Sequence, residues 1–289
     1  MEARGLKRHV IGRGRVGAGG VARSGALFVL PLLLVMMVSF NAPIALMLAW
    51  SAHDPPFTLK HYEELFGTAI YLKVMANTAR IALATTLICG VIGYPLALWI
   101  RGLSPNARIA ALAVVVLPFW ISILVRTYAW IVMLGNAGLV NRTLLGLGIT
   151  GSPISIIYNE FGVLVGTANV LLPFLVLPLY AAMLRVDERL LQAAASLGAS
   201  SRTIFWRVFF PLTLPALGAG LVLVFILTLG FYITPAILGG GRVPMISNML
   251  DLLINQLPNW ELAAAISTVL LIAVLAANAI GSRLRARSG

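Results

Sequence analysis

Six long apolar runs, almost free of charged residues, dominate this sequence and leave it few possible folds. They cover residues 26–50, 74–100, 108–134, 161–184, 211–236 and 262–283. A helix needs about 20 apolar residues to cross a bilayer, and each run is long enough. The alternation of apolar and polar residues that is typical of a membrane barrel is absent. The sequence therefore predicts an all-α integral membrane protein with six transmembrane helices in a lipid bilayer.

The basic residues fall on one side of this six-span topology. A formal net charge of +12 can indicate nucleic acid, but here the charges are segregated by loop. One side carries Arg4, Lys7, Arg8, Arg13, Arg15, Arg23, Arg101, Arg108, Arg185, Arg189, Arg202, Arg207, Arg283, Arg285 and Arg287. The other carries Lys60, Lys73, Arg142 and Arg242, outnumbered by Asp54, Glu63, Glu64, Glu160, Asp251 and Glu261. The positive-inside rule then places both termini and residues 187–210 in the cytoplasm, and we expect no nucleic-acid partner.

The first apolar run bears on how the chain is divided. It is much longer than the roughly 7 to 15 residues of a signal-peptide core, so a retained first span is expected. We expect residues 1–24 to be a basic cytoplasmic tail, 25–285 the six-span domain and 286–289 a second cytoplasmic tail.

Residues suited to catalysis or metal binding are scarce. The three lysines each follow a leucine, so the Gly-Lys pair of a phosphate-binding P-loop is missing. Histidines occur only at His9, His53 and His61, outside the apolar runs, and a loop in water explains the last two better than a metal site with Asp54. Cys89 is a single cysteine inside a run, where a small buried side chain is expected. The sequence predicts no metal site and no catalytic residue.

Two arginines lie within apolar runs. Arg80 is near the external end of its run, where its side chain can reach the interface. Arg126 lies deeper, and an arginine in hydrocarbon costs about 2.5 to 3.5 kcal/mol, so it should face protein or water. It could pack against neighbouring helices or line a substrate path. Tyr128 and Trp130 beside it could belong to an interfacial aromatic belt or to a binding site.

A polar interruption between the fourth and fifth runs is the most informative segment. Helical spacing places Leu190, Ala193, Ala194 and Leu197 on one face, and Gly198 ends this pattern. A second amphipathic stretch follows with Ile204, Phe205, Val208 and Phe209, and Pro211 and Pro215 are expected to begin the next span. About four to six residues would suffice to connect two spans, so the interruption predicts a docking site for another protein.

This interruption resembles the cytoplasmic loop of permease subunits of ATP-binding-cassette importers. The family pattern is Glu-Ala-Ala, three residues and Gly, with a later Leu-Pro exit; here Gln192, Ala193, Ala194, Gly198 and Pro215 occupy those positions. Gln192 departs from the usual glutamate. Residues 118–135, 171–190 and 231–241, with the Asn-Trp pair at 259–260, are similar to the spermidine/putrescine branch.

The resemblance implies the type I importer permease fold, with a cytoplasmic coupling helix, in the cell inner membrane. It implies that the ATPase-coupling residues are Gln192, Ala193, Ala194, Leu197, Gly198, Phe205, Trp206 and Pro215. It also implies three kinds of protein partner: a cytoplasmic ATPase dimer, a second homologous permease and an extracytoplasmic solute-binding protein. This chain would bind no cofactor, since ATP and Mg would be used by the ATPase. Candidates for the path of a polyamine or related small organic solute are Arg126, Tyr128, Trp130, Tyr232, Thr234 and Asp251.

Two other classes of protein remain open. An ion-coupled secondary transporter would show two related halves and polar ion-binding residues within the membrane, which this sequence lacks. A membrane scaffold or receptor that transports nothing would explain the spans and the docking segment, but not Arg126.

Overall fold

The computed structural model describes residues 18–53 and 57–286, and every regular element in these ranges is a helix. The chain forms two compact units, Met1–Ala49 and Trp50–Gly289. The first unit is built on α1 (Ala18–Trp50), which continues to the boundary of the second. Of the predicted basic tail, residues 1–17 lie outside the described residues and 18–24 are helical. Asp54 and residues 287–289 of the predicted C-terminal tail also lie outside the described ranges.

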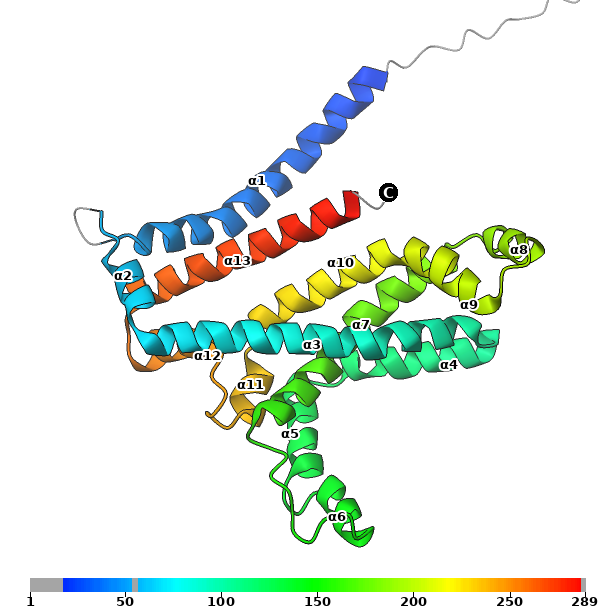
Figure 1. Cartoon of the computed structure of the whole chain (residues 1–289). Helices are drawn as coiled ribbons and strands as arrows, with labels where there is room; N and C mark the ends of the chain where they lie inside the picture. The colour runs from blue at the N-terminus through cyan, green and yellow to red at the C-terminus, as the bar shows by residue number, and fades with distance from the viewer. Residues whose placement is uncertain (1–17, 54–56, 287–289) are drawn as a thin grey trace, which may run out of the picture. The chain divides into compact units, whose positions relative to one another are not determined.

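The second unit is organised around long helices that pack side by side. Helix α3 (Ala69–Gly102) packs against α7 (Glu160–Leu184) and α10 (Phe210–Leu229), which also contact each other (Figure 1). Helix α13 (Trp260–Ala286) packs on α10. The remaining elements are α2 (Lys60–Gly67), α4 (Pro105–Val116), η1 (Leu117–Trp120), α5 (Ile123–Leu134), α6 (Leu139–Gly146), α8 (Glu188–Ser196), α9 (Ser201–Ile204), η2 (Phe205–Phe209), α11 (Ile233–Leu238), α12 (Ile246–Asp251) and η3 (Leu252–Gln256).

Small residues let the central helices approach closely. Leu175 of α7 is fully buried, and a Cβ added at Gly93 of α3 would lie 2.9 Å from its Cδ2. Gly220 of α10 faces the same leucine side chain. Threonine hydroxyls in these helices donate to the carbonyl four residues earlier, as Thr228 does to Val224 at 2.7 Å. Such bonds satisfy polar groups where water is absent, as a helix in a bilayer requires.

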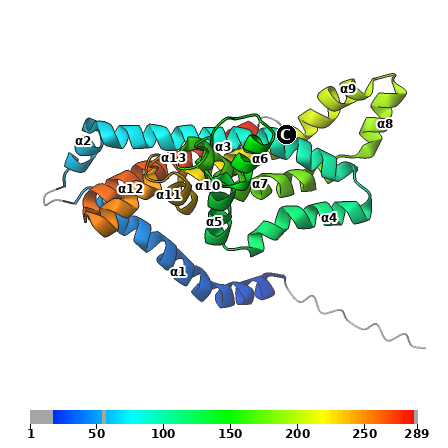
Figure 2. The same ribbon diagram turned by 90° about the horizontal axis from the view of Figure 1, so that it is seen from below.

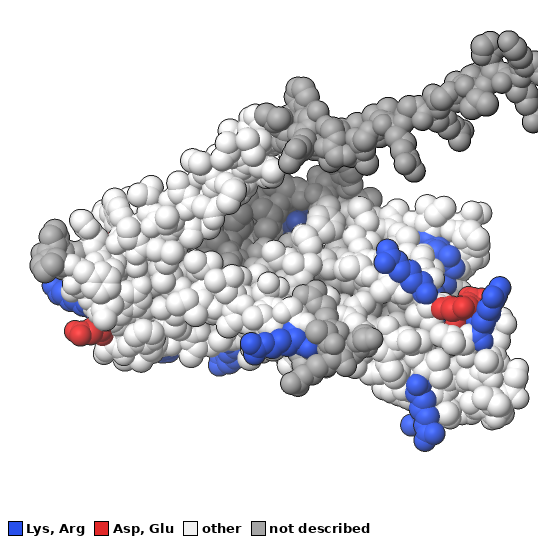
Figure 3. All heavy atoms as spheres, turned by 90° about the horizontal axis from the view of Figure 1, so that it is seen from above, with Lys and Arg blue, Asp and Glu red and all other residues white. Residues whose placement is uncertain are grey.

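The outward faces of the helices suit contact with lipid. On α3, Ile81 and Cys89 are buried, whereas Leu83, Leu87 and Val91 are exposed on another face. Figure 3 shows a face of the molecule on which most of the area carries no charged side chain. Because apolar patches of this extent are rare on soluble monomers, these surfaces indicate a membrane environment.

Within the described residues, six helices are long and apolar enough to cross a membrane, which confirms the predicted number. They are Val29–Trp50, Ala69–Gly102, Ile123–Gly146, Glu160–Leu184, Ser201–Leu229 and Trp260–Arg283. The bounds of the third prediction were wrong, because residues 108–134 are not one helix. Pro118 has no amide to continue the helical hydrogen bonds, and Ile121 is extended at φ −94°, ψ 131°. Helices α4 and α5 therefore run in different directions (Figure 2).

The start of the fifth span also differs from the prediction. Helix α9, the π-helical turn η2 and α10 follow one another without a break from Ser201 to Leu229. The amide of Phe210 donates to the carbonyl of Phe205, five residues earlier, and so completes the π-helical turn. Pro211 and Pro215 thus lie inside a continuous helix and do not begin it.

Candidate functional site

The candidate site is the segment of residues 187–210, called here the coupling loop, at the Gly102 end of α3 (Figure 1). Asp187 begins it: its Oδ1 accepts from the amide of Arg189 at 2.9 Å and caps α8. Ser200 caps α9 in the same way, with its Oγ accepting from the amide of Thr203 at 3.3 Å. Two capped helices therefore form the loop, as the amphipathic pattern predicted.

Gly198 makes the turn between the two helices. Its φ is +81°, in the left-handed region that favours glycine. The Gly198 amide donates to the Ala195 carbonyl at 2.9 Å, and the Ala199 amide donates to the Ala194 carbonyl at 3.1 Å. This pair of bonds is the Schellman motif, which closes a helix C-terminus. The predicted glycine turn is thus present, and its geometry fixes the direction in which α8 projects.

The coupling loop exposes apolar side chains at its turn and along both of its helical parts. Leu197 is 89% exposed, and Leu190 and Trp206 are about half exposed. Gln192, Ala193 and Gly198 are also exposed, while Ala194 and Phe205 are partly buried. Exposed leucine and tryptophan on a loop rich in polar residues are what a protein-binding surface offers. Pro215 lies apart from these residues, partly buried within α10.

Aromatic packing joins the base of the coupling loop to the long helices. The Tyr94 ring of α3 meets the Phe205 and Phe210 rings edge to face, with centroids 6.3 and 5.4 Å apart. The Tyr94 hydroxyl shares a 2.9 Å hydrogen bond with the hydroxyl of Thr213. Phe209 is buried in the same cluster as Leu179 and Met183 of α7. A displacement of the coupling loop must therefore move these contacts with α3 and α7.

Arg101, at the end of α3, contacts the coupling loop twice. Its Nη2 lies 3.7 Å from Oε1 of Glu188 in α8, and its guanidinium carbon lies 4.9 Å from the centroid of the Phe209 ring. Its carbonyl accepts from Nη2 of Arg108 at 2.9 Å. In the sequence, Arg101 is one of the predicted cytoplasmic charges and carries no sign of a further role. Only the folded structure brings it to Glu188, 87 positions later in the chain.

Two of the predicted path residues lie together, at the other end of α3. The hydroxyl of Tyr232 donates to Oδ2 of Asp251 at 3.0 Å, and Nδ2 of Asn255 donates to Oδ1 at 2.8 Å. The hydrogen bond to the carboxylate raises the pKa of the Tyr232 hydroxyl, because losing the proton would break it. Both side chains line a cavity of about 370 Å³ beside the segment 241–244. A carboxylate and an aromatic ring therefore face one cavity.

The other four predicted path residues do not join this cavity. Thr234 is buried in α11, against Gly166 of α7. On α5, Tyr128 is exposed, whereas Trp130 packs with a buried cluster that includes Leu134 and Leu238. Arg126 is partly buried, and its Nε has no hydrogen-bond partner among the described residues. Since these side chains point to different surroundings, the structure does not bring the six candidates into one site.

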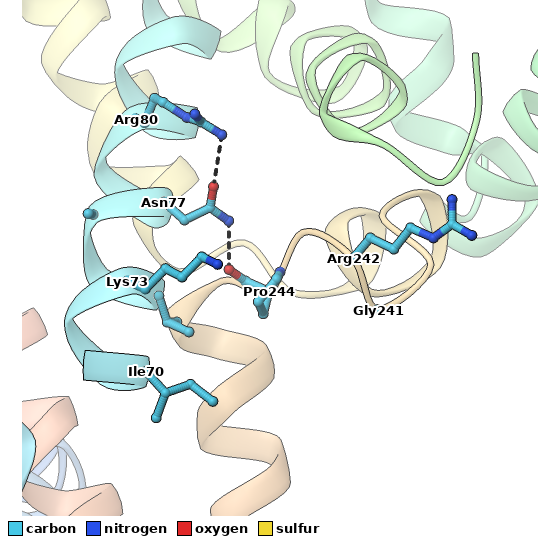
Figure 4. A pocket seen from close by; sticks show the side chains of 9 residues that line it. Ile70, Lys73, Asn77, Arg80, Gly241, Arg242 and Pro244 are labelled. Atoms are coloured by element: carbon cyan, nitrogen blue, oxygen red, sulfur yellow. Dashed lines mark hydrogen bonds between the residues drawn. The ribbon is translucent and has the colours of Figure 1, made fainter. Parts of the chain in front are cut away.

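A second cavity, which sequence reasoning missed, lies between α3 and the segment 241–244. Its volume is about 560 Å³, and its lining includes Lys73, Asn77, Arg80 and Arg242 (Figure 4). Arg80 does more than extend toward the interface: its Nη2 forms a 2.6 Å ion pair with Oε2 of Glu160 at the start of α7. The sequence placed Lys73 and Arg242 among the external charges and Arg80 near the external end of its run, but only the fold brings these three residues to one cavity.

A family model described as "Binding-protein-dependent transport system inner membrane component" matches residues 90–287. The chain belongs to this family. It is a multi-pass permease component of an inner-membrane ABC importer, a transport subunit and not an enzyme, which confirms the prediction from the loop motif.

The chain is also similar to individual permease proteins and to solved transporter structures. The spermidine/putrescine transport system permease protein PotB of Haemophilus influenzae is 39% identical over 214 residues, covering 73% of this chain and 74% of that protein. A putative 2-aminoethylphosphonate transport system permease protein of Salmonella typhimurium is 29% identical, covering 70% and 72%. A bacterial alginate ABC transporter, solved with an alginate pentasaccharide-bound periplasmic protein, has the same fold: TM-score 0.75, 20% identity, coverage 92% and 97%.

Proposed function

We propose that this permease binds a cytoplasmic ATPase through the coupling loop and transmits ATP-driven movement to its membrane helices. The observation that carries the proposal is the capped, bent loop whose tip exposes Leu197 to 89%. Exposure of an apolar side chain to water is unfavourable. Burial of a leucine side chain by a partner contributes about 1.5 to 3 kcal/mol of favourable free energy. The ATPase supplies the energy and uses ATP and Mg, while this chain binds neither.

The base of the coupling loop supports transmission of force. Helix α9 continues into α10 through η2, and Phe205, Phe209 and Arg101 attach this continuous helix to α3. Interiors packed in this way resist local compression, so a push on the loop moves the helices together. The family pattern at Ala193, Ala194 and Gly198, with Gln192 in place of glutamate, supports the same assignment.

The same proposal sets the orientation and the other partners. Both termini and the coupling loop face the cytoplasm, since basic residues concentrate on that side. One chain supplies six spans, and a second homologous permease completes the translocation path. An extracytoplasmic solute-binding protein delivers the solute to the opposite side, as the family description implies.

For the solute we propose a polyamine such as spermidine or putrescine. The name of the Haemophilus relative supports this class, and so does the cavity that holds Asp251 and Tyr232. A multiple cation that leaves water needs carboxylates and aromatic faces, which these two residues provide. Tyr232 and Asp251 are the residues we place on the path, and Arg126, Tyr128, Trp130 and Thr234 have no shared geometry that supports this role.

The test is Gly198→Glu in the assembled importer. Among the described residues, no atom lies within 4 Å of a Cβ built at Gly198, so the substitution causes no clash at this position. It does disturb the backbone at φ +81° and the surface that we propose binds the ATPase. We expect insertion in the membrane to be unchanged, copurification of the ATPase to fall and uptake to be lost. Gly148→Glu is a matched control, because Gly148 has φ +68°, equally open surroundings and a place outside the coupling loop. Normal uptake and copurification by Gly198→Glu would refute the proposed coupling.

A further inference from the structure

The cavity of about 560 Å³ between α3 and the segment 241–244 carries an excess of positive charge. Lys73 and Arg80 belong to α3, and Arg242 belongs to the facing segment. Figure 4 shows Lys73 and Asn77 extending from α3 toward Pro244, with Arg242 on the far side of the segment. This cavity lies at the Ala69 end of α3, which the proposed orientation places on the extracytoplasmic side.

Hydrogen bonds hold the two walls of this cavity in place. Nδ2 of Asn77 donates to the Pro244 carbonyl at 2.8 Å, and the amide of Ile246 donates to the Thr78 hydroxyl at 2.9 Å. Asn77 also accepts from Nη2 of Arg80 at 3.2 Å, so one amide group links α3, the facing segment and a guanidinium (Figure 4). The cations are therefore presented by a fixed framework.

Only one of the three cations has a carboxylate partner in the described part of the chain. Arg80 pairs with Glu160 at 2.6 Å. The two ion pairs found in the described residues, Arg80–Glu160 and Arg101–Glu188, include neither Lys73 nor Arg242. Two positive charges at the cavity thus have no ion-pair partner among the described residues, and an anionic group is the ligand that would supply one.

We infer that this cavity receives carboxylates from an acidic surface of the extracytoplasmic solute-binding protein. The inference rests on the proposed function, which provides that partner. All three cationic side chains are exposed, whereas a small-molecule site usually encloses most of its ligand. Exposed charges act mainly by steering a charged protein partner into place.

The solute itself does not fit this cavity. A polyamine carries several positive charges, and Lys73 and Arg242 would repel it. Gly241 and Pro244 line both cavities, so the acidic cavity with Asp251 lies next to the basic one. The two neighbouring cavities therefore serve different ligands: the acidic one faces the cationic solute and the basic one holds the protein that delivers it.

The experiment measures association of the solute-binding protein with the complete importer in nanodiscs. The test variant is Lys73→Gln with Arg242→Gln, and the control is Arg142→Gln, which removes an exposed external cation on α6. We expect the double variant to associate about tenfold more slowly at low salt and the control to match wild type. The difference should shrink as salt rises, because exposed charges are screened beyond about 10 Å at 0.1 M. The basal ATPase rate reports that each variant is correctly assembled.

Several results would overturn the inference. One is association of the double variant at the wild-type rate, and another is an equal effect of Arg142→Gln. A third arm adds succinate at constant ionic strength: if it blocks association and is itself transported, the cavity binds a free carboxylate and not a protein surface. If the wild-type importer fails to bind any solute-binding protein, the proposed function fails and this inference fails with it. If the wild-type importer binds the solute-binding protein and the double variant associates at the same rate, this inference fails while the proposed function stands.

Discussion

Leu197→Ser should weaken binding of the ATPase without affecting the fold of the permease. Because Leu197 is 89% exposed in the chain, little of its side chain packs on the permease itself. A surface substitution of this kind changes stability by about 0.5 kcal/mol or less. Burial of a leucine side chain in a partner contributes about 1.5 to 3 kcal/mol. Nearly all of the side chain is available for that burial, and each 1.4 kcal/mol is tenfold, so we expect affinity to fall about 10-fold to 100-fold.

The assay titrates the purified ATPase onto the permease pair in nanodiscs and records binding and ATPase activity. Leu147→Ser is the control: Leu147 is 69% exposed at the end of α6, on the side proposed to be external. We expect the control to bind as wild type does. Equal ATPase affinity for Leu197→Ser and wild type would refute the reasoning, and so would an equal loss in the Leu147→Ser control. Thermal unfolding of each permease separates a folding defect from a docking defect.

Two further predictions concern the base of the coupling loop and the acidic cavity. Arg101→Gln removes the contacts with Glu188 and Phe209. We expect the free energy of unfolding to fall by at most about 1 kcal/mol, because Glu188 is exposed. We expect the number of ATP molecules hydrolysed per solute transported to rise. Arg101→Lys, which keeps the charge, should restore part of the coupling, and an unchanged ratio in Arg101→Gln would exclude this role. Asp251→Asn should raise the KM for spermidine uptake up to about fivefold, as expected for a solvent-exposed ion pair. An unchanged KM would remove Asp251 from the path.

Much of the fold followed from hydrophobic length alone. A run of apolar residues must be a helix in a bilayer, because no water is there to satisfy the backbone, and this sufficed for the number of spans. The third span escaped prediction because its apolar residues continue through the break at Pro118 to Ser122. Hydrophobicity indicates which residues avoid water, whereas the break in the helix between Pro118 and Ser122 depends on backbone geometry. The fifth span begins earlier than predicted for a similar reason, since Pro211 is accommodated inside a continuous helix.

The site was predictable where its signal is local. Gly198 was expected to turn the chain because the helical pattern stops there, and its φ of +81° confirms the turn. Tyr232 and Asp251, which are hydrogen-bonded, lie only 19 positions apart in the sequence, and both are among the predicted path residues. Arg101 and Lys73 were missed because their significance comes from residues far away in the chain. Topology alone explains a charge near a span end, and the tertiary contacts on which the proposed roles of Arg101 and Lys73 rest cannot be seen in the sequence.

The contacts of the coupling loop indicate how a single displacement could reach more than one helix. On one side of Gly198, Glu188 of α8 meets Arg101 of α3. On the other side, the helix that begins at Ser201 enters the membrane as α10 and packs against both α3 and α7. The turn at Gly198 is closed by two hydrogen bonds, so the halves of the loop cannot swing freely without breaking them. Under the proposed coupling, a push on α8 would reach α3 and α10 together. For this reason we expect loss of the Arg101 contacts to waste ATP and to leave ATPase binding intact.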